Sequence, residues 1–255
     1  MSLEFLNLTS IEKELRFSQW CRNEGVKCFL LDLDDTLCPT RQVFKEFMSQ
    51  AYCYLENSVP AVSKEKWKEE IETINDRLFE KLGVNSNRWN YVVDELAEKH
   101  LLGEKIKQET KQIFQQIYDT PFTFLDGAEE GLTFIGKVGI PIGIVTHAGP
   151  EWTWKKYNWL NLRRFLNWDD VFMVDENKHK TTESWVQAIR YFGLKAGECA
   201  VVGDSPRSDI NPAREAGVRN CFLVEDPKQW VVHDQQMDES VKKIKSLNRL
   251  IEALF

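Results

Sequence analysis

Three aspartates lie directly after a short apolar segment near the N-terminus. In the stretch FLLDLDDTLCP at residues 29–39 they are Asp32, Asp34 and Asp35. In an extended strand, residues 32 and 34 face the same way, so their carboxylates repel each other unless a cation relieves the repulsion. A hard cation such as Mg²⁺ takes carboxylate oxygens as ligands. A carboxylate can also act as a nucleophile, and a second carboxyl can act as general acid and base.

Polar side chains also follow the later apolar segments of the chain. These residues are Thr146, His147, Lys178, His179, Lys180, Asp204 and Asp209. If the apolar segments are parallel strands, their carboxyl ends meet at one edge of the sheet, where open α/β sheets bind ligands. A hydroxyl and backbone N–H groups can hold phosphate oxygens, and a lysine can neutralise them as a point charge. Together these residues are suited to binding a phosphate group and a divalent cation.

Short apolar segments and helical segments alternate along most of the chain. The predicted strands are Cys28–Leu31, Ile140–Val145, Val171–Val174, Ala200–Val202 and Cys221–Val224. The predicted helices span about 9–24, 128–137, 151–159, 182–192 and 209–216. Such alternation is typical of a parallel sheet covered by helices on both faces. We therefore predict an α/β fold with a doubly wound parallel sheet.

The segment 41–118 differs from the rest of the chain because it is rich in Lys, Glu and Gln and contains no predicted strand. Its apolar residues recur at helical spacing, as in Phe44, Phe47, Met48 and Ala51. This periodicity indicates four helices. Since they fall between the first and second predicted strands, we expect a core of residues 1–38 and 120–255 with a helical subdomain inserted at 39–119.

Two further patterns concern packing. The C-terminal segment Val241–Phe255 has apolar residues at helical spacing, which predicts a helix packed on the core, with a partner surface as the alternative. Four tryptophans, at 152, 154, 159 and 168, are close in sequence. Such a cluster is more often packed between helix and sheet than used to stack on a ligand.

The bulk composition argues against several functions. The net charge of −7 disfavours nonspecific nucleic-acid binding, which depends on neutralising phosphates with Lys and Arg. No apolar run approaches the ~18 residues that a membrane span requires, and the N-terminus does not resemble a signal peptide. The six cysteines lack the close spacing of zinc or redox motifs, and we expect reduced thiols in a cytoplasmic protein. The sequence does not indicate an oligomeric state.

Four motifs together resemble those of the haloacid dehalogenase-like (HAD) hydrolase superfamily. They are DLDDTL at 32–37, IVTHAG at 144–149, a lysine near 180, and VVGDSPRSD at 201–209, in the family's order and at similar separations. The resemblance covers about 29–37 and 122–225. The helical segment is similar to the family's first type of cap in its position and helical character only.

The resemblance implies a role for each matched residue. Asp32 would be the nucleophile and Asp34 the general acid and base, while Thr146 would bind the transferring phosphoryl group. A lysine would neutralise charge on Asp32 and on the phosphoryl oxygens. Mg²⁺ would be bound by Asp32, the backbone carbonyl of Asp34 and Asp204, with Asp209 supporting the site.

The sequence departs from the family pattern at three positions. Asp35 stands where the family often has Gly, and His147, which could contact the substrate, stands where it often has Asn. The lysine motif usually reads Lys-Pro, whereas here it is NKHKTTESW at 177–185, so either Lys178 or Lys180 could be the lysine. We favour Lys180, because the threonines that follow it can cap the next helix and place it at the helix entrance.

These observations predict a Mg²⁺-dependent phosphatase that hydrolyses a phosphomonoester through an aspartyl-phosphate intermediate. The inserted helices would exclude water and large substrates, which indicates a small phosphorylated metabolite. The alternatives are a haloacid dehalogenase, a phosphomutase, and a binding protein without catalytic activity. Asp34 and Asp204 count against the dehalogenase, because displacing a halide requires neither the acid and base nor the metal site.

Overall fold

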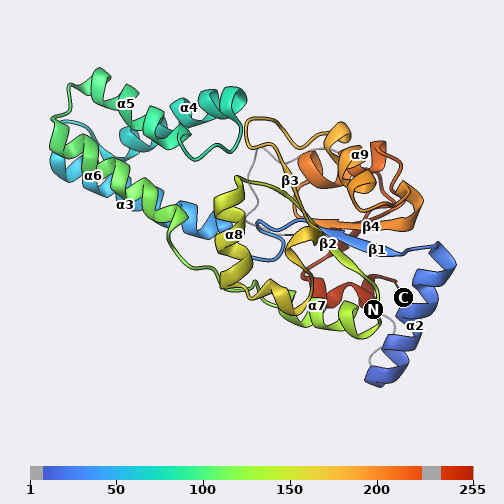
Figure 1. Ribbon diagram of the computed structural model, residues 1–255. Coiled ribbons are helices and arrows are strands. Elements are labelled where there is room, and N and C mark those ends of the chain that lie inside the picture. The colour runs from blue at the N-terminus through green and yellow to red at the C-terminus, as the bar shows by residue number, and fades with distance from the viewer. Residues whose placement is uncertain (1–7, 226–236, 255) are drawn as a thin grey trace.

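The computed structural model describes residues 8–225 and 237–254. Its centre is a sheet of six strands in the order β3-β2-β1-β4-β5-β6, and every neighbouring pair is parallel (Figure 1). The strands are β1 Cys28–Leu31, β2 Ile142–His147, β3 Val171–Val174, β4 Cys199–Gly203, β5 Asn220–Val224 and β6 Lys242–Ile244. The predicted α/β class with a parallel sheet is confirmed.

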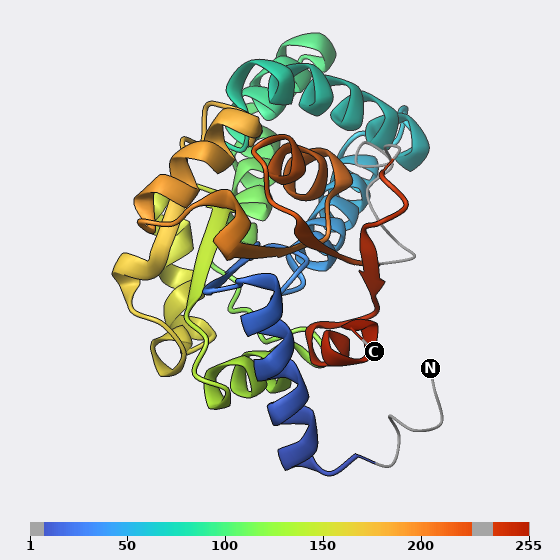
Figure 2. The ribbon, with the colours of Figure 1, turned by 90° about the vertical axis from the view of Figure 1, so that its right-hand side faces the viewer.

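Helices cover both faces of this sheet. They are α2 Ser10–Glu24, α7 Ala128–Lys137, α8 Pro150–Trp159, α9 Thr182–Tyr191 and α10 Asn211–Glu215. Figure 2 shows α2 and α7 on one side of the sheet and α9 and α10 on the other. Short 3₁₀ helices connect some elements: η2 Leu162–Arg164, η3 Trp168–Asp170 and η4 Ala196–Glu198. The doubly wound arrangement that the alternating sequence pattern predicts is therefore present.

Strand β1 lies in the middle of the sheet and is buried on both faces. Phe29 and Leu31 belong to the hydrophobic cluster on the α2 and α7 side, whereas Leu30 belongs to the cluster on the α9 side. This division follows from the period of two in a strand, which turns successive side chains to opposite faces. A strand buried in this way must be apolar throughout, so its first polar residue, Asp32, marks the point where the strand ends.

Four helices follow β1 before the chain returns to the sheet. They are α3 Thr40–Ser58, α4 Lys64–Leu82, α5 Arg88–His100 and α6 Glu104–Gln115, and the 3₁₀ helix η1 Gln116–Tyr118 comes after them. They pack around their own hydrophobic cluster, which includes Leu55, Trp67, Ile71 and Leu96. Figure 1 shows this helical unit to one side of the sheet. The number of helices agrees with the prediction, and the proposed limits at 39 and 119 stay a prediction.

The C-terminal segment differs from the prediction of a single helix. Its described residues form strand β6 and two 3₁₀ helices, η7 Leu247–Arg249 and η8 Ile251–Leu254, whereas Phe255 lies outside them. The backbone groups at the edge of β5 need partners, and β6 supplies them, for example through Glu225 N–H to the Ile244 carbonyl at 2.8 Å. Val241, Ile244, Leu247 and Ile251 are nevertheless all buried. Their spacing therefore marked inward-facing positions, but not a helix.

Two other boundaries are also corrected. Strand β2 extends through His147, two residues beyond the predicted end, so Thr146 and His147 belong to the strand itself. The segment predicted as a helix from 209 begins as a π-helix, η5 Pro206–Ile210, and continues as α10. Among the described residues, no helix is long and apolar enough to cross a membrane.

Candidate active site

The turn after β1 positions the aspartates. The N–H of Asp32 donates to the Val202 carbonyl of β4 at 2.9 Å, and this bond continues the sheet to its edge. Asp35 has a φ of 59°, in the left-handed region, and its carboxylate accepts the N–H of Arg41 at 2.8 Å in the first turn of α3. Asp is one of the residues that tolerate this conformation, so it can replace the usual glycine. These bonds therefore hold the backbone of residues 32–35 at the edge of the sheet.

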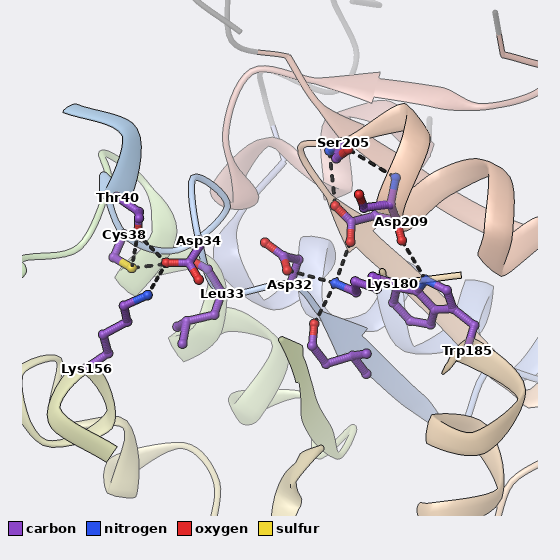
Figure 3. Close-up of polar contacts among 12 residues, drawn as sticks. Asp32, Leu33, Asp34, Cys38, Thr40, Lys156, Lys180, Trp185, Ser205 and Asp209 are labelled. Carbon is purple, nitrogen blue, oxygen red and sulfur yellow. Dashed lines mark hydrogen bonds and ion pairs between the residues drawn. The ribbon is translucent and has the colours of Figure 1, made fainter. Parts of the chain in front are cut away.

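Lys180 lies at the centre of the acidic site. Its ammonium donates to Asp32 Oδ1 at 2.8 Å, to Asp209 Oδ1 at 2.5 Å and to the Val145 carbonyl at 2.7 Å (Figure 3). Burial opposes the charge on Lys180, but the carboxylates of Asp209 and Asp32 outweigh it and raise the lysine pKa. The side chain of Lys178 is 74% exposed and pairs with Asp175 at 3.6 Å. Lys180 is therefore the lysine that the fold brings to the aspartates.

Three buried aspartates form a potential metal site. A carboxylate oxygen from each of Asp32, Asp204 and Asp209 lies within 4.8 Å of the others. Burial raises the pKa of Asp32 to about 7 despite the opposing effect of Lys180, and the pKa of Asp204 is raised well above its usual value by burial and by the neighbouring acids. Burial and the mutual repulsion of these acids thus both disfavour their charged forms. A divalent cation with oxygen ligands fits such a donor set.

The backbone holds Asp209 in this cluster. Its second oxygen accepts the N–H of Ser205 at 3.1 Å. A Cβ atom at Gly203 would lie 2.5 Å from Asp209, so the close approach of this side chain to the end of β4 requires glycine there. The motif at 201–209 therefore brings both of its aspartates to the end of β1.

The side chain of Asp34 has different partners. Its Oδ1 accepts the Lys156 ammonium and the Thr40 hydroxyl, and it is not among the three aspartates of the potential metal site (Figure 3). The predicted metal ligand from this residue is its backbone carbonyl, and that prediction stays open. Asp32 and Asp34 thus share one edge of the sheet but have separate surroundings.

Lys156 is a site residue that the sequence analysis missed. It lies on α8, its side chain is fully buried, and its ammonium lies 3.3 Å from the centroid of the Trp152 ring. The preceding residue, Lys155, is partly exposed and pairs with Asp119 at 2.8 Å. Two adjacent lysines in one helix look alike in a sequence, so only the tertiary partners distinguish them.

Thr146 and His147 lie at the end of β2. Thr146 is buried and His147 is partly buried, and within the described chain neither the Thr146 hydroxyl nor His147 Nε2 has a hydrogen-bond partner. Burial and the nearby Lys180 lower the pKa of His147 to about 4, so the imidazole is neutral at neutral pH. A buried hydroxyl without a partner is unusual in a folded protein, and a bound phosphate oxygen would satisfy it.

The parallel sheet and the site at its edge define a haloacid dehalogenase-like hydrolase. The family model described as "haloacid dehalogenase-like hydrolase" matches residues 26–217, which is more than half of the chain, so the chain belongs to this family. The family resemblance drawn from the four motifs is confirmed.

Individual relatives are more distant. A glyceraldehyde 3-phosphate phosphatase from Pyrococcus furiosus is 25% identical over 201 residues, which is 78% of this chain and 80% of the relative. A haloacid dehalogenase-like family hydrolase from Xanthomonas campestris has a TM-score of 0.74 at 13% identity, covering 90% of this chain and 91% of that one. A 2-haloacid dehalogenase from Pseudomonas syringae has a TM-score of 0.61 at 20% identity, covering 90% and 98%. The structural matches show the fold alone, which both hydrolases share.

Proposed function

We propose that this protein is a Mg²⁺-dependent phosphatase that hydrolyses a small phosphomonoester through an aspartyl-phosphate intermediate. The observation that carries the proposal is the buried ammonium of Lys180, which joins Asp32 to Asp209 beside Asp204. One carboxylate in this arrangement can attack phosphorus while the surrounding positive charge stabilises the phosphoryl oxygens. The phosphatase name of the Pyrococcus relative supports the same reaction class.

The reaction has two steps. In the first, an oxygen of Asp32 attacks phosphorus, the bond to the leaving oxygen breaks, and Asp34 gives that oxygen a proton. In the second, Asp34 takes a proton from water as the water attacks phosphorus, which releases phosphate and restores the Asp32 carboxylate. The Thr146 hydroxyl and the Lys180 ammonium would bind phosphoryl oxygens, and His147, which follows Thr146 in β2, would contact the substrate as a neutral group.

The residues that would hold Mg²⁺ are Asp32, Asp204 and the backbone carbonyl of Asp34, with Asp209 bound to Lys180 and Ser205 behind them. When bound, the cation would neutralise the carboxylates and the phosphoryl oxygens, so that two negatively charged groups can approach each other. Burial raises the pKa of Asp32 to about 7, and the charges of Asp209 and Asp34 act in the same direction, so a cation at this site would favour the carboxylate form that the reaction needs.

We propose that the helical unit is a cap that selects small substrates. The loop between α4 and α5 contacts the segment that leads from β3 to Lys180. Val84 N–H donates to the Glu176 carbonyl at 2.9 Å, and Asn85 donates to Asn177 at 2.9 Å. These contacts join the helical unit to the segment between β3 and Lys180, which supports a cap at the edge of the sheet where Asp32 lies. A lid in this position leaves room for a compact phosphorylated metabolite, and excludes water during phosphoryl transfer.

The first test is hydrolysis of an aryl phosphate by the purified protein with Mg²⁺, with a chelator, and by the Asp32→Asn variant. We expect Mg²⁺-dependent release of phosphate, and a loss of at least ~100-fold in the variant because the nucleophile is gone. Asp175→Asn is the matched control, since Asp175 also follows a strand but lies on the surface beside Lys178. This control is expected to keep wild-type activity.

The alternatives give different outcomes. Halide release from chloroacetate without phosphatase activity would establish a dehalogenase, and transfer of phosphate between sugar positions without net release would establish a mutase. If neither aryl phosphates nor a panel of phosphorylated metabolites is turned over with Mg²⁺, the proposal is wrong and a binding protein remains. Residual activity above about a hundredth in Asp32→Asn would overturn the nucleophile assignment.

A further inference from the structure

Lys156 is a buried cation whose position the four motifs do not explain. It lies on α8, which follows the motif at 144–149, and its side chain has no exposed surface. Burying an ammonium is costly unless it is paired. Its anionic partner is Asp34, the residue to which we assign proton transfer.

Two donors converge on one oxygen of Asp34. The Lys156 ammonium and the Thr40 hydroxyl both donate to Oδ1 (Figure 3). Thr40 is the first residue of α3, and Lys156 lies in α8, so the two donors come from different helices. Because both bonds use Oδ1, the carboxyl group cannot rotate without breaking them, and Oδ2 is the oxygen that can exchange a proton with the leaving group or with water.

The other side of Lys156 is held by aromatic rings. Its ammonium lies 3.3 Å from the centroid of Trp152 and 5.4 Å from that of Phe122. Trp152 in turn contacts Tyr118 at 4.8 Å and Phe44 at 5.9 Å between ring centroids. Phe44 and Tyr118 lie at the two ends of the helical unit, where the chain leaves the sheet and returns to it. The ammonium is thus fixed from both sides.

We propose that Lys156 is a positioning residue that, together with Thr40, orients Asp34 so that Oδ2 carries the proton in both chemical steps. Lys156 does not contact the substrate, and acts only through Asp34. The inference rests on the proposed phosphatase function, because it assigns a role to the acid and base of that reaction. If Lys156 acts only through Asp34, removing Lys156 from a protein that already lacks Asp34 does not change the rate further.

The test is a double-mutant cycle of wild type, Lys156→Met, Asp34→Asn and the double variant. Met has a similar shape but is one atom shorter, and it removes both the ammonium that donates to Asp34 and the contact of that ammonium with the Trp152 ring. On an alkyl phosphate, whose leaving oxygen needs a proton, Lys156→Met should lower kcat/KM by about 10- to 100-fold, part of the 10²–10⁴ that acid–base catalysis supplies. In the Asp34→Asn background the same change should have no further effect.

A second measurement, with 4-nitrophenyl phosphate, distinguishes a role in positioning Asp34 from a general loss of active-site structure. The phenolate that leaves 4-nitrophenyl phosphate needs no proton, so Lys156→Met should keep the rapid first release of nitrophenol and lose rate only in the steady state, where Asp34 activates water. Lys155→Met is the matched control, because Lys155 is adjacent and pairs with Asp119 instead. It should behave as wild type with both substrates.

Three results would overturn the proposal in distinguishable ways. An equal loss from Lys156→Met in both backgrounds, or an equal loss of the first release and the steady state, would show that Lys156 supports structure only. If Lys156→Met does not fold, Thr40→Val removes the other donor to Oδ1, and it must then show the same dependence on Asp34. A wild-type protein without turnover of any phosphomonoester would overturn the proposed function, and this inference with it.

Discussion

Replacing Lys180 by Met should destabilise the protein strongly, whereas the same change at Lys178 should not. Met has a similar length but no ammonium, so Lys180→Met would remove the common donor to Asp32, Asp209 and the Val145 carbonyl. The side chain of Lys180 is 1% exposed and that of Lys178 is 74% exposed. The pair of variants therefore compares a buried ionic contact with a surface one at almost the same point in the chain.

The expected size of the effect follows from the burial of the remaining charges. Removing one partner of a buried ion pair costs about 3–5 kcal/mol, because the other charge stays buried. The remaining carboxylates can instead take up protons, and because the pKa of Asp32 is already about 7, this route keeps the loss near the lower end of that range. At ~2–4 °C per kcal/mol for a domain of this size, the melting temperature should fall by roughly 10 °C.

The assay is thermal unfolding in metal-free buffer at pH 7, followed by circular dichroism. Lys178→Met should melt within about 2 °C of wild type, because a surface ion pair contributes at most ~1 kcal/mol. The phosphatase rate of the Lys180 variant should also fall, whereas that of the Lys178 variant should not. If the two variants melt together, or if Lys180→Met melts like wild type, the reasoning about the buried contact is wrong.

Two further predictions concern His147 and Gly83. The pKa of His147 is lowered from 6.5 to about 4, so below pH 6.5 the unfolded chain takes up a proton that the folded one does not, and stability is lost as pH falls. Urea unfolding should show that wild type loses about 2 kcal/mol more than His147→Asn between pH 7 and pH 5, and equal losses would contradict the buried neutral imidazole. Gly83 has a φ of 59°, and a Cβ there would lie 2.3 Å from the Glu176 carbonyl, whereas at Gly25, with a φ of 72°, nothing lies within 4 Å. Gly25→Ala should therefore cost about 1–2 kcal/mol for the left-handed backbone, and Gly83→Ala clearly more; equal costs in urea unfolding would contradict the close contact between the helical unit and the core.

The positions of the site residues were predictable where they depend on strand ends. Apolar strands in a parallel sheet end at one edge, so the residues after β1 and β4 had to meet, and they do in Asp32, Asp204 and Asp209. The choice of Lys180 over Lys178 followed from the helix that begins after it, and the contacts of Lys180 with Asp32 and Asp209 agree with that choice. In each case a local signal, the end of a strand or the start of a helix, placed the residue at this edge of the sheet.

The features that the sequence did not reveal depend on tertiary partners. The apolar residues in and after β6 have the spacing that is typical of a helix. The segment forms a strand instead, because the edge of β5 provides backbone hydrogen-bond partners. Lys156 is buried because Trp152, one turn earlier in α8, and Asp34, from a distant position in the sequence, lie beside it. The spacing of apolar residues indicates which side of a segment faces inward. It does not indicate which polar side chain from another segment lies on that side.

The central place of β1 has a consequence for the order of folding. On one side, residues 29–31 pair with residues 142–144 of β2. On the other side, residues 28–31 pair with residues 199–202 of β4. The first strand of the sheet to be synthesised therefore pairs with segments that are synthesised much later. The helical unit α3–α6 has its own hydrophobic cluster and can pack as soon as it leaves the ribosome. Pairing between segments that are far apart in the sequence is slow, and an apolar strand is prone to aggregation until it is paired. We therefore expect nascent chains to depend on chaperones until β4 has emerged from the ribosome. Asp32 is synthesised early, but it is among the last residues to reach its final surroundings.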